Sequence, residues 1–119
     1  MTPGSRILVV DDNQDFREML GLALRGSGYH VSEAGDGEAA LQVLATTTLD
    51  MAIVDLDMPK LNGLALSKKI KETMPEFPIV MVTGYAQFYT PAEILSVGID
   101  AFLQKPVPME KLLDVIQKI

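Results

Sequence analysis

The amino-acid sequence predicts an α/β fold in which a single parallel sheet carries helices on both faces. Short apolar runs that suit buried strands alternate five times with segments of helical periodicity. The connections between them are only a few residues long, as in right-handed strand–helix–strand units. Three of the apolar runs, at 7–10, 51–54 and 79–82, are unbroken, which is typical of strands covered on both sides. The fold class is therefore α/β.

The first half of the chain contains the predicted central strand. We expect strands at 7–10, 30–34 and 51–55 and helices at 13–26 and 38–45. Asn13 is a good N-cap for the first helix, and Gly26 and Gly28 stop it. The central strand runs directly into Asp55, and Pro59 marks the turn that follows.

The second half continues the alternation. We expect helices at 64–72 and 92–97, strands at 78–83 and 101–103, and a final helix marked by Leu112, Leu113, Ile116 and Ile119. Pro75 ends the first of these helices, and the strand after it finishes at Thr83 and Gly84. The last strand leads to Lys105 and Pro106. Two of the strands in this half therefore end at a polar side chain.

Composition limits the classes of function. The chain has 119 residues, the size of one domain, which we expect at 6–119 after a short polar lead at 1–5. Its net charge of −6 argues against direct nucleic-acid binding. No apolar run approaches the roughly 20 residues of a membrane span, and there is no cysteine, so we expect a cytoplasmic domain that does not bind membranes.

Four of the five predicted strands end at a chemically useful side chain. The set is Asp11, Asp12, Asp55, Thr83 and Lys105. The carboxyl ends of parallel strands lie along one edge of the sheet, where ligands bind, so these groups should converge. Each one alone has a simpler explanation: the acidic pair as helix caps, Asp55 as a turn residue, Thr83 as a strand residue and Lys105 as a solvated lysine. The complete set favours a functional site.

The predicted cluster suits a metal ion and a phosphoryl group. Three neighbouring carboxylates repel one another unless a cation neutralises them, and oxygen ligands select a hard ion such as Mg²⁺. Lys105 and Thr83 add a positive charge and a hydroxyl donor, which could take charge from phosphoryl oxygens. Asp55 would then attack in line and form an aspartyl phosphate.

With these motifs in place, the sequence resembles a receiver domain of a two-component response regulator, in the CheY-like superfamily. The resemblance spans 7–119 and rests on four motifs taken together: Val-Val-Asp11-Asp12-Asn13, Asp55-Leu-Asp-Met-Pro59 through Gly63, Thr83-Gly84-Tyr85-Ala86, and Lys105-Pro106. It implies a flavodoxin-like fold with strand order 2-1-3-4-5 and a role in phosphorelay signal transduction.

The resemblance also implies roles for individual residues. Asp55 would be the phosphoacceptor and a ligand to Mg²⁺, together with Asp11, Asp12 and the backbone carbonyl of Asp57. Lys105 would pair with the phosphoryl group, and its peptide bond to the following proline would be cis.

A switch follows from the same resemblance. Thr83 and Phe102 would be the switch pair, and their movement would repack the surface made by the fourth helix, fifth strand and fifth helix. Phe102 lacks the hydroxyl of a tyrosine, so its part would rest on packing alone. Asp57, Gly84 and Tyr85 would tune the lifetime of the phosphorylated state.

The segment 87–94 lies in the region that the resemblance gives to the output surface. Its side chains Phe88, Tyr89 and Ile94 either form an exposed binding patch or pack inward, and the sequence favours neither.

The expected partners follow from the resemblance. A histidine kinase or histidine phosphotransfer protein would donate the phosphoryl group, and the switch surface would bind an output domain or a second copy. The domain would assist its own phosphorylation and slow dephosphorylation without being a turnover enzyme.

Two other functions fit parts of the sequence. Asp55-Leu56-Asp57 resembles the start of a haloacid-dehalogenase-type phosphatase, although the motif lies mid-chain and no cap segment is present. Alternatively, the chain is a receiver that signals only by protein contact, with an unused site.

Overall fold

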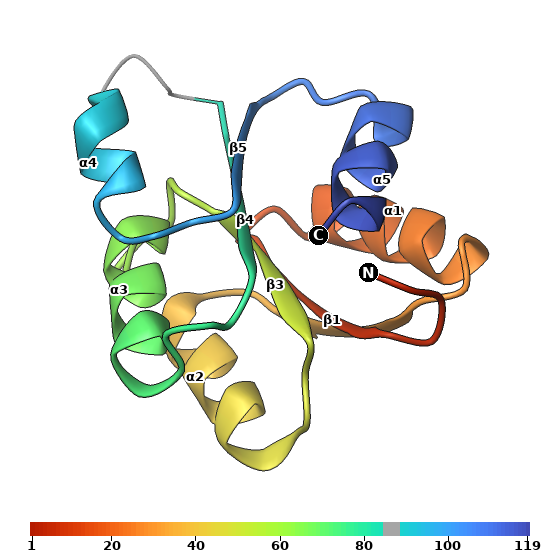
Figure 1. The fold of residues 1–119 in the computed structure, drawn as a ribbon, viewed down its shortest axis with the longest axis horizontal. Coiled ribbons are helices and arrows are strands. Elements are labelled where there is room, and N and C mark those ends of the chain that lie inside the picture. The colour runs from red at the N-terminus through yellow and green to blue at the C-terminus, as the bar shows by residue number, and fades with distance from the viewer. Residues whose placement is uncertain (85–88) are drawn as a thin grey trace.

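The protein forms a three-layer α/β domain in which a parallel sheet lies between two layers of helices (Figure 1). The structure is a computed structural model and describes residues 1–84 and 89–119. Within these residues the strands are β1 (Arg6–Val10), β2 (His30–Ala34), β3 (Met51–Asp55), β4 (Ile79–Thr83) and β5 (Ala101–Gln104). Their order is β2-β1-β3-β4-β5, which confirms the predicted flavodoxin-like topology.

The helices follow the strands in alternation. They are α1 (Gln14–Gly26), α2 (Gly37–Thr46), α3 (Gly63–Thr73), α4 (Pro91–Leu95) and α5 (Met109–Gln117). Helices α1 and α5 cover one face of the sheet, and α2, α3 and α4 lie on the other (Figure 1). Every connection therefore returns the chain to the edge of the sheet where the strands begin, and all five parallel strands end together at the opposite edge.

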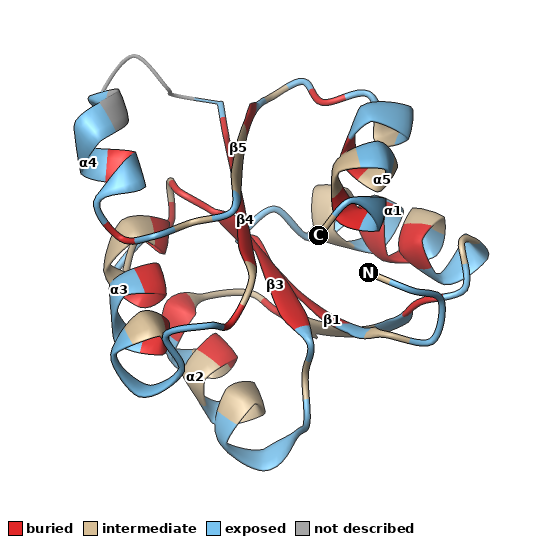
Figure 2. Ribbon diagram, in the orientation of Figure 1, coloured by how far each residue is buried: buried red, intermediate tan, exposed pale blue. Residues whose placement is uncertain are grey.

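The central strands are buried because helices cover both of their faces. Every residue of β3 and β4 is buried, and Figure 2 shows the middle of the sheet as the most buried part of the fold. Alternate side chains divide between two cores. Met51 and Ile53 pack toward α1 and α5, whereas Ala52 and Val54 pack toward α2 and α3.

Side-chain caps fix where the helices begin. Asn13 accepts a hydrogen bond from the backbone N–H of Phe16, so it is the N-cap of α1, as predicted. Helix α4 is shorter than the predicted 92–97. A capping box between Thr90 and Glu93 makes Thr90 the N-cap, so the helix begins at Pro91, and it ends at Leu95. Val97 lies outside the helix and packs into the core beside Ile94.

The amino-terminal residues lie beside the end of α5 (Figure 1). The amino group of Met1 donates a hydrogen bond to the carbonyl of Ile116 at 2.6 Å, and the Tyr29 hydroxyl donates to the carbonyl of Met1. In the part of the chain that the structure describes, no helix is both long and apolar enough to cross a membrane.

Gly63 permits the close contact between α3 and the end of β3. A Cβ atom at this position would lie 2.2 Å from the carbonyl oxygen of Asp55 and 2.8 Å from the Cα of Leu56. Both are backbone atoms that cannot move aside without displacing the strand end. A side chain at position 63 would therefore disturb the segment that carries Asp55.

We predict that Gly63→Ala lowers the free energy of unfolding by at least about 2 kcal/mol, because the added methyl group overpacks against backbone. Urea denaturation followed by circular dichroism measures the change. Gly26→Ala is the matched control: nothing lies within 4 Å of its added Cβ, so it should be neutral or stabilise by up to about 1 kcal/mol. Equal stabilities for the two variants would contradict this account.

Candidate functional site

The carboxyl edge of the sheet contains a polar cavity. Its volume is about 440 Å³, and it is lined by Asp11, Asp12, Asn13, Asp55, Asp57, Gly84 and Lys105. These residues lie at or just after the carboxyl ends of β1, β3, β4 and β5. The structure thus brings together side chains that are up to 94 residues apart in the sequence, as the strand-end pattern predicts.

Three carboxylates form the centre of the site. Asp11, Asp12 and Asp55 each place an oxygen within 4.8 Å of the others. Asp11 and Asp55 are only 2% and 5% exposed, so water screens their mutual repulsion weakly. The donors are all hard carboxylate oxygens, which is a set that fits a divalent cation such as Mg²⁺. The cluster is therefore compatible with binding a divalent metal.

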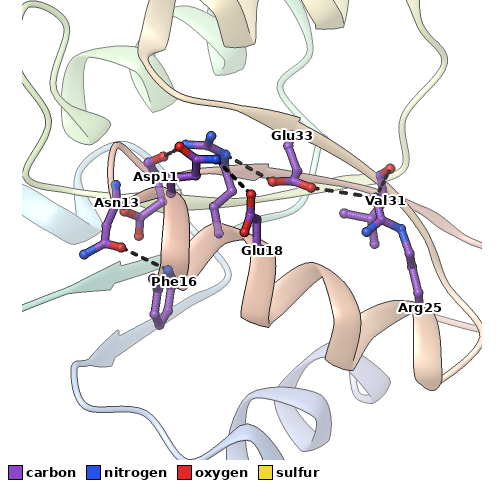
Figure 3. A network of polar contacts seen from close by, with 9 residues as sticks. Asp11, Asn13, Phe16, Glu18, Arg25, Val31 and Glu33 are labelled. Atoms are coloured by element: carbon purple, nitrogen blue, oxygen red, sulfur yellow. Dashed lines mark hydrogen bonds and ion pairs between the residues drawn. The ribbon is translucent and has the colours of Figure 1, made fainter.

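Asp11 is held at both carboxylate oxygens. The backbone N–H of Asn13 donates to Oδ1 at 2.9 Å, and the Lys105 ammonium donates to Oδ2, also at 2.9 Å. Asn13 in turn caps α1, so one short turn fixes the acidic pair and the start of the helix together (Figure 3). This turn gives Asp11 a defined orientation despite its charged neighbours.

A network of charged side chains supports the same turn from α1 and β2 (Figure 3). The Arg17 guanidinium donates to the carbonyl oxygen of Asp11 at 2.7 Å and to the Glu33 carboxylate at 3.1 Å. Arg25 lies 3.8 Å from the second oxygen of Glu33. Arg17 therefore connects Glu33 of β2 to the backbone of Asp11, whose side chain is buried in the site.

Lys105 provides positive charge inside the cavity. Its ammonium lies 2.9 Å from Asp11 and 3.8 Å from the Oδ1 atom of Asp55, and its side chain is 24% exposed. The Phe16 ring lies on another side of the ammonium, 4.3 Å from nitrogen to ring centroid. The peptide bond from Lys105 to Pro106 is cis.

The environment of Asp55 disfavours its charged form. Burial, and after it the charge of Asp11, raise the pKa of its carboxyl group from 3.8 to about 7. The Lys105 ammonium and a 3.3 Å hydrogen bond from the Asp57 backbone N–H act in the opposite direction. A cation bound to the cluster would favour the ionised carboxylate, so metal binding and deprotonation of Asp55 are coupled.

The Asp57 side chain has a partner that the sequence does not indicate. Its carboxylate accepts a hydrogen bond from the Thr83 hydroxyl, across the gap between the ends of β3 and β4. Its backbone N–H contacts Asp55 at the same time. Asp57 thus links the candidate phosphoacceptor to the candidate switch residue.

The candidate output region packs mostly inward. Ile94 is buried, and Tyr89 and Phe102 are partly buried against the same small core as Met81. For Tyr89 and Ile94, inward packing is therefore the correct alternative.

The Tyr89 hydroxyl lies in a predominantly acidic environment. Partial burial raises its pKa, and the charges of Asp57, Glu93 and Asp55 raise it further. Tyr85 and Phe88, for which the sequence suggests roles, lie outside the described residues.

Three residues that contact or support the site were not predicted from the sequence: Phe16, Arg17 and Glu33. Phe16 reads as an ordinary apolar position of α1, and Arg17 as a solvated helix residue. The only signal was the place of both in the first turn after the Asp11-Asp12 pair. The position of Glu33 opposite Val9 follows from the β1–β2 register, which no local pattern provides.

The comparisons with known proteins agree with this geometry. The model of the response regulator receiver domain family matches residues 7–117. The response regulator MprA of Mycolicibacterium vanbaalenii is 37% identical over 108 residues, which cover 91% of this chain and 47% of MprA. The chain therefore spans about half the length of this relative.

Solved structures give the same result. A CheY-like receiver domain protein from Methanospirillum hungatei has a TM-score of 0.92 and 30% identity, covering 97% of this chain and 92% of its own. The response regulator TrrA of Thermotoga maritima, solved in complex with Mg²⁺-BeF, has a TM-score of 0.87 and 29% identity, covering 96% and 97%. The chain belongs to the response regulator receiver domain family.

This assignment fixes the broad function. The receiver domain takes part in two-component phosphorelay signalling, and it belongs to a class of switches rather than of turnover enzymes. The family match over 7–117 favours this function over the haloacid-dehalogenase-type phosphatase, which only the Asp55-Leu56-Asp57 segment suggested.

We predict that the charge on Asp55 makes the receiver domain less stable as pH rises from about 4 to 7 without divalent metal. The folded domain keeps the Asp55 proton up to about pH 7, whereas the unfolded chain loses it near 3.8. The folded state binds more protons in this window, so the free energy of unfolding falls as pH increases.

Asp55→Asn removes this penalty. Its stability advantage over the natural sequence should grow between pH 4 and 8, by up to ~4 kcal/mol at about 1.4 kcal/mol for each pKa unit. Urea denaturation in the presence of a chelator measures it at each pH. Asp114→Asn, at an exposed site on α5, is the control and should show no such growth. An Asp55→Asn advantage that is the same at all pH values would disprove the prediction.

Proposed function

We propose that Asp55 is the phosphoacceptor of this receiver domain and that its phosphorylation controls a binding surface. The observation that supports this most directly is the position of Asp55. It is a buried carboxylate at the end of the central strand, grouped with Asp11 and Asp12 and 3.8 Å from the Lys105 ammonium. Among the described residues, Asp11 and Asp55 are the buried carboxylates, and both lie in the candidate metal cluster near Lys105. Asp11 already accepts the hydrogen bond of Lys105, which leaves Asp55 as the candidate phosphoacceptor.

The proposed reaction is transfer from a phosphohistidine. A carboxylate oxygen of Asp55 forms a bond to phosphorus as the N–P bond of the donor breaks, and the electron pair of that bond stays on the imidazole nitrogen. Lys105 turns from Asp11 toward a phosphoryl oxygen. Mg²⁺, held by Asp11, Asp12, Asp55 and the backbone carbonyl of Asp57, would supply positive charge to the phosphoryl oxygens.

The phosphoryl group is then lost by slow hydrolysis at the same site. The domain therefore keeps its phosphorylated state for a limited time and is not a turnover enzyme. The complex of TrrA with Mg²⁺-BeF supports a metal-assisted site in a receiver of this fold.

Thr83 and Phe102 form the proposed switch. The Thr83 hydroxyl now donates to Asp57, and after phosphorylation it would donate to a phosphoryl oxygen. The Phe102 ring belongs to the small core that packs beneath α4, so movement of Thr83 would change the packing there. The phosphoryl group thus favours one of two packings of the α4-β5-α5 surface.

The proposed partners follow from the function and from the length of the relatives. A cytoplasmic histidine kinase or phosphotransfer protein donates the phosphoryl group. The α4-β5-α5 surface then binds an output domain or a second copy. MprA, which is named as a response regulator and is about twice as long as this chain, supports an output region in the complete protein.

The proposal predicts a single acyl phosphate on Asp55. Incubation with acetyl phosphate and Mg²⁺ should add one phosphoryl group, which intact-mass spectrometry detects and hydroxylamine removes. Asp55→Ala should abolish it, and Asp114→Ala should not change it. An unmodified protein, or an adduct that persists in Asp55→Ala, would refute the proposal.

A titration with beryllofluoride and Mg²⁺ tests whether the site is complete but unused. Binding that depends on Asp55 supports phosphoryl chemistry, and no binding supports a receiver that signals by contact alone.

We also predict that Asp57 shortens the life of the phosphorylated state. Asp57→Ala removes the acceptor that competes for the Thr83 hydroxyl, so the bond from Thr83 to the phosphoryl oxygen should persist. We expect dephosphorylation to slow roughly two- to tenfold, the effect of about one hydrogen bond. Loss of the adduct over time measures the rate, with Asp114→Ala as the control. Tyr85 and Gly84 remain proposed tuning positions. An unchanged or faster rate in Asp57→Ala would show that this contact does not set the lifetime.

A further inference from the structure

Phe16 lies in a place that connects α1 to the chemistry of the site. It is the third residue of α1, and its backbone N–H is fixed by the Asn13 cap at 3.0 Å. Its ring is half-buried at the edge of the core between the sheet, α1 and α5. The Lys105 ammonium lies over the ring, 4.3 Å from its centroid. The ring therefore contacts both the core and the cavity.

The charged partners of Lys105 cannot by themselves hold its ammonium in place throughout the proposed reaction. A lysine side chain has a flexible four-carbon stem and loses much rotamer freedom when its ammonium is held in one place. The two anionic neighbours of this ammonium, Asp11 and Asp55, both change their role in the proposed reaction. Asp11 would bind the cation, and Asp55 becomes an acyl phosphate. Lys105 must then exchange one anion for another without leaving the cavity.

The Phe16 ring is a partner of the Lys105 ammonium that stays unchanged during the proposed reaction. The face of an aromatic ring attracts an ammonium through its quadrupole, and the attraction is stronger where water is partly excluded. Lys105 is 24% exposed, so most of its side chain meets this condition. A neutral ring stays in place when a cation and a phosphoryl group take the carboxylates.

We propose that Phe16 is a positioning residue for Lys105, and that its ring face holds the ammonium within reach of the phosphoryl group while the anionic partners exchange. The inference rests on the proposed function, because it concerns the rate of phosphorylation at Asp55. A purely packing role is the alternative, since the same ring also contacts the core. The two differ in one property: packing depends on the shape of the ring, and the attraction to Lys105 depends on its electrons.

Fluorination of the ring separates shape from electrons. Mono-, di- and trifluorinated phenylalanine at position 16 nearly keep the ring's shape and progressively weaken its quadrupole. The rate constant for phosphorylation by acetyl phosphate with Mg²⁺ should fall with each fluorine, and by about two- to tenfold across the series. Phe16→Tyr, which keeps the ring face, should retain the rate, and Phe16→Leu should lose at least as much as the trifluorinated protein.

Two controls make the result specific. The same series at Phe77, in the core on the opposite face of the sheet, should leave the rate unchanged. In a Lys105→Met background, where the residual rate is lower, fluorination at position 16 should no longer have a graded effect. Thermal melting of every variant shows whether it is folded, and Phe16→Leu and Phe16→Tyr provide the comparison if a fluorinated protein is not.

The outcomes are distinct from those of the proposed function. If the natural protein is phosphorylated on Asp55 but the series at position 16 is flat, the ring only packs and the inference is wrong. A gradient that persists in Lys105→Met, or that appears equally at Phe77, also overturns it. Failure of Asp55 to become phosphorylated in the unaltered protein would instead count against the proposed function.

Discussion

The balance of charge at the carboxyl edge of the sheet is the constraint on which the site depends. Asp11 and Asp55 are buried there beside Asp12, and like charges at this separation repel strongly where water is excluded. The Lys105 ammonium offsets part of the repulsion, and the raised pKa of Asp55 reflects first its burial and then the remaining repulsion from Asp11. The site is therefore primed to bind positive charge, which is the condition for accepting a phosphoryl group together with a metal ion.

The fold maintains this unfavourable cluster by making the surrounding backbone rigid. Strands β1, β3 and β4 are buried on both faces, so their ends have little freedom to separate. Gly63 lets α3 approach the backbone at Asp55 more closely than any side chain would allow. The burial of apolar side chains in the two cores thus stabilises a backbone that holds the carboxylates of Asp11 and Asp55 close together despite their repulsion.

Helix α1 contributes more to the site than its amphipathic pattern suggests. Its N-cap Asn13 belongs to the turn that orients Asp11, and Arg17 holds the carbonyl of the same residue with Glu33 as a counter-charge. Phe16 faces Lys105 from the same first turn. One turn of helix therefore orients an acidic residue and the lysine that neutralises it, and the core that anchors α1 also anchors the site.

The sequence by itself determined the α/β class, most helix and strand boundaries to within one residue, and the convergence of Asp11, Asp12, Asp55, Thr83 and Lys105. Apolar periodicity and caps are local signals, and a parallel sheet brings strand ends together whatever the details. Only the tertiary structure decided that Thr83 donates to Asp57, that Glu33 faces Arg17 and that Phe16 lies against Lys105. Those contacts depend on strand register and side-chain direction, which arise from packing between segments distant in the sequence and leave no mark on any local pattern.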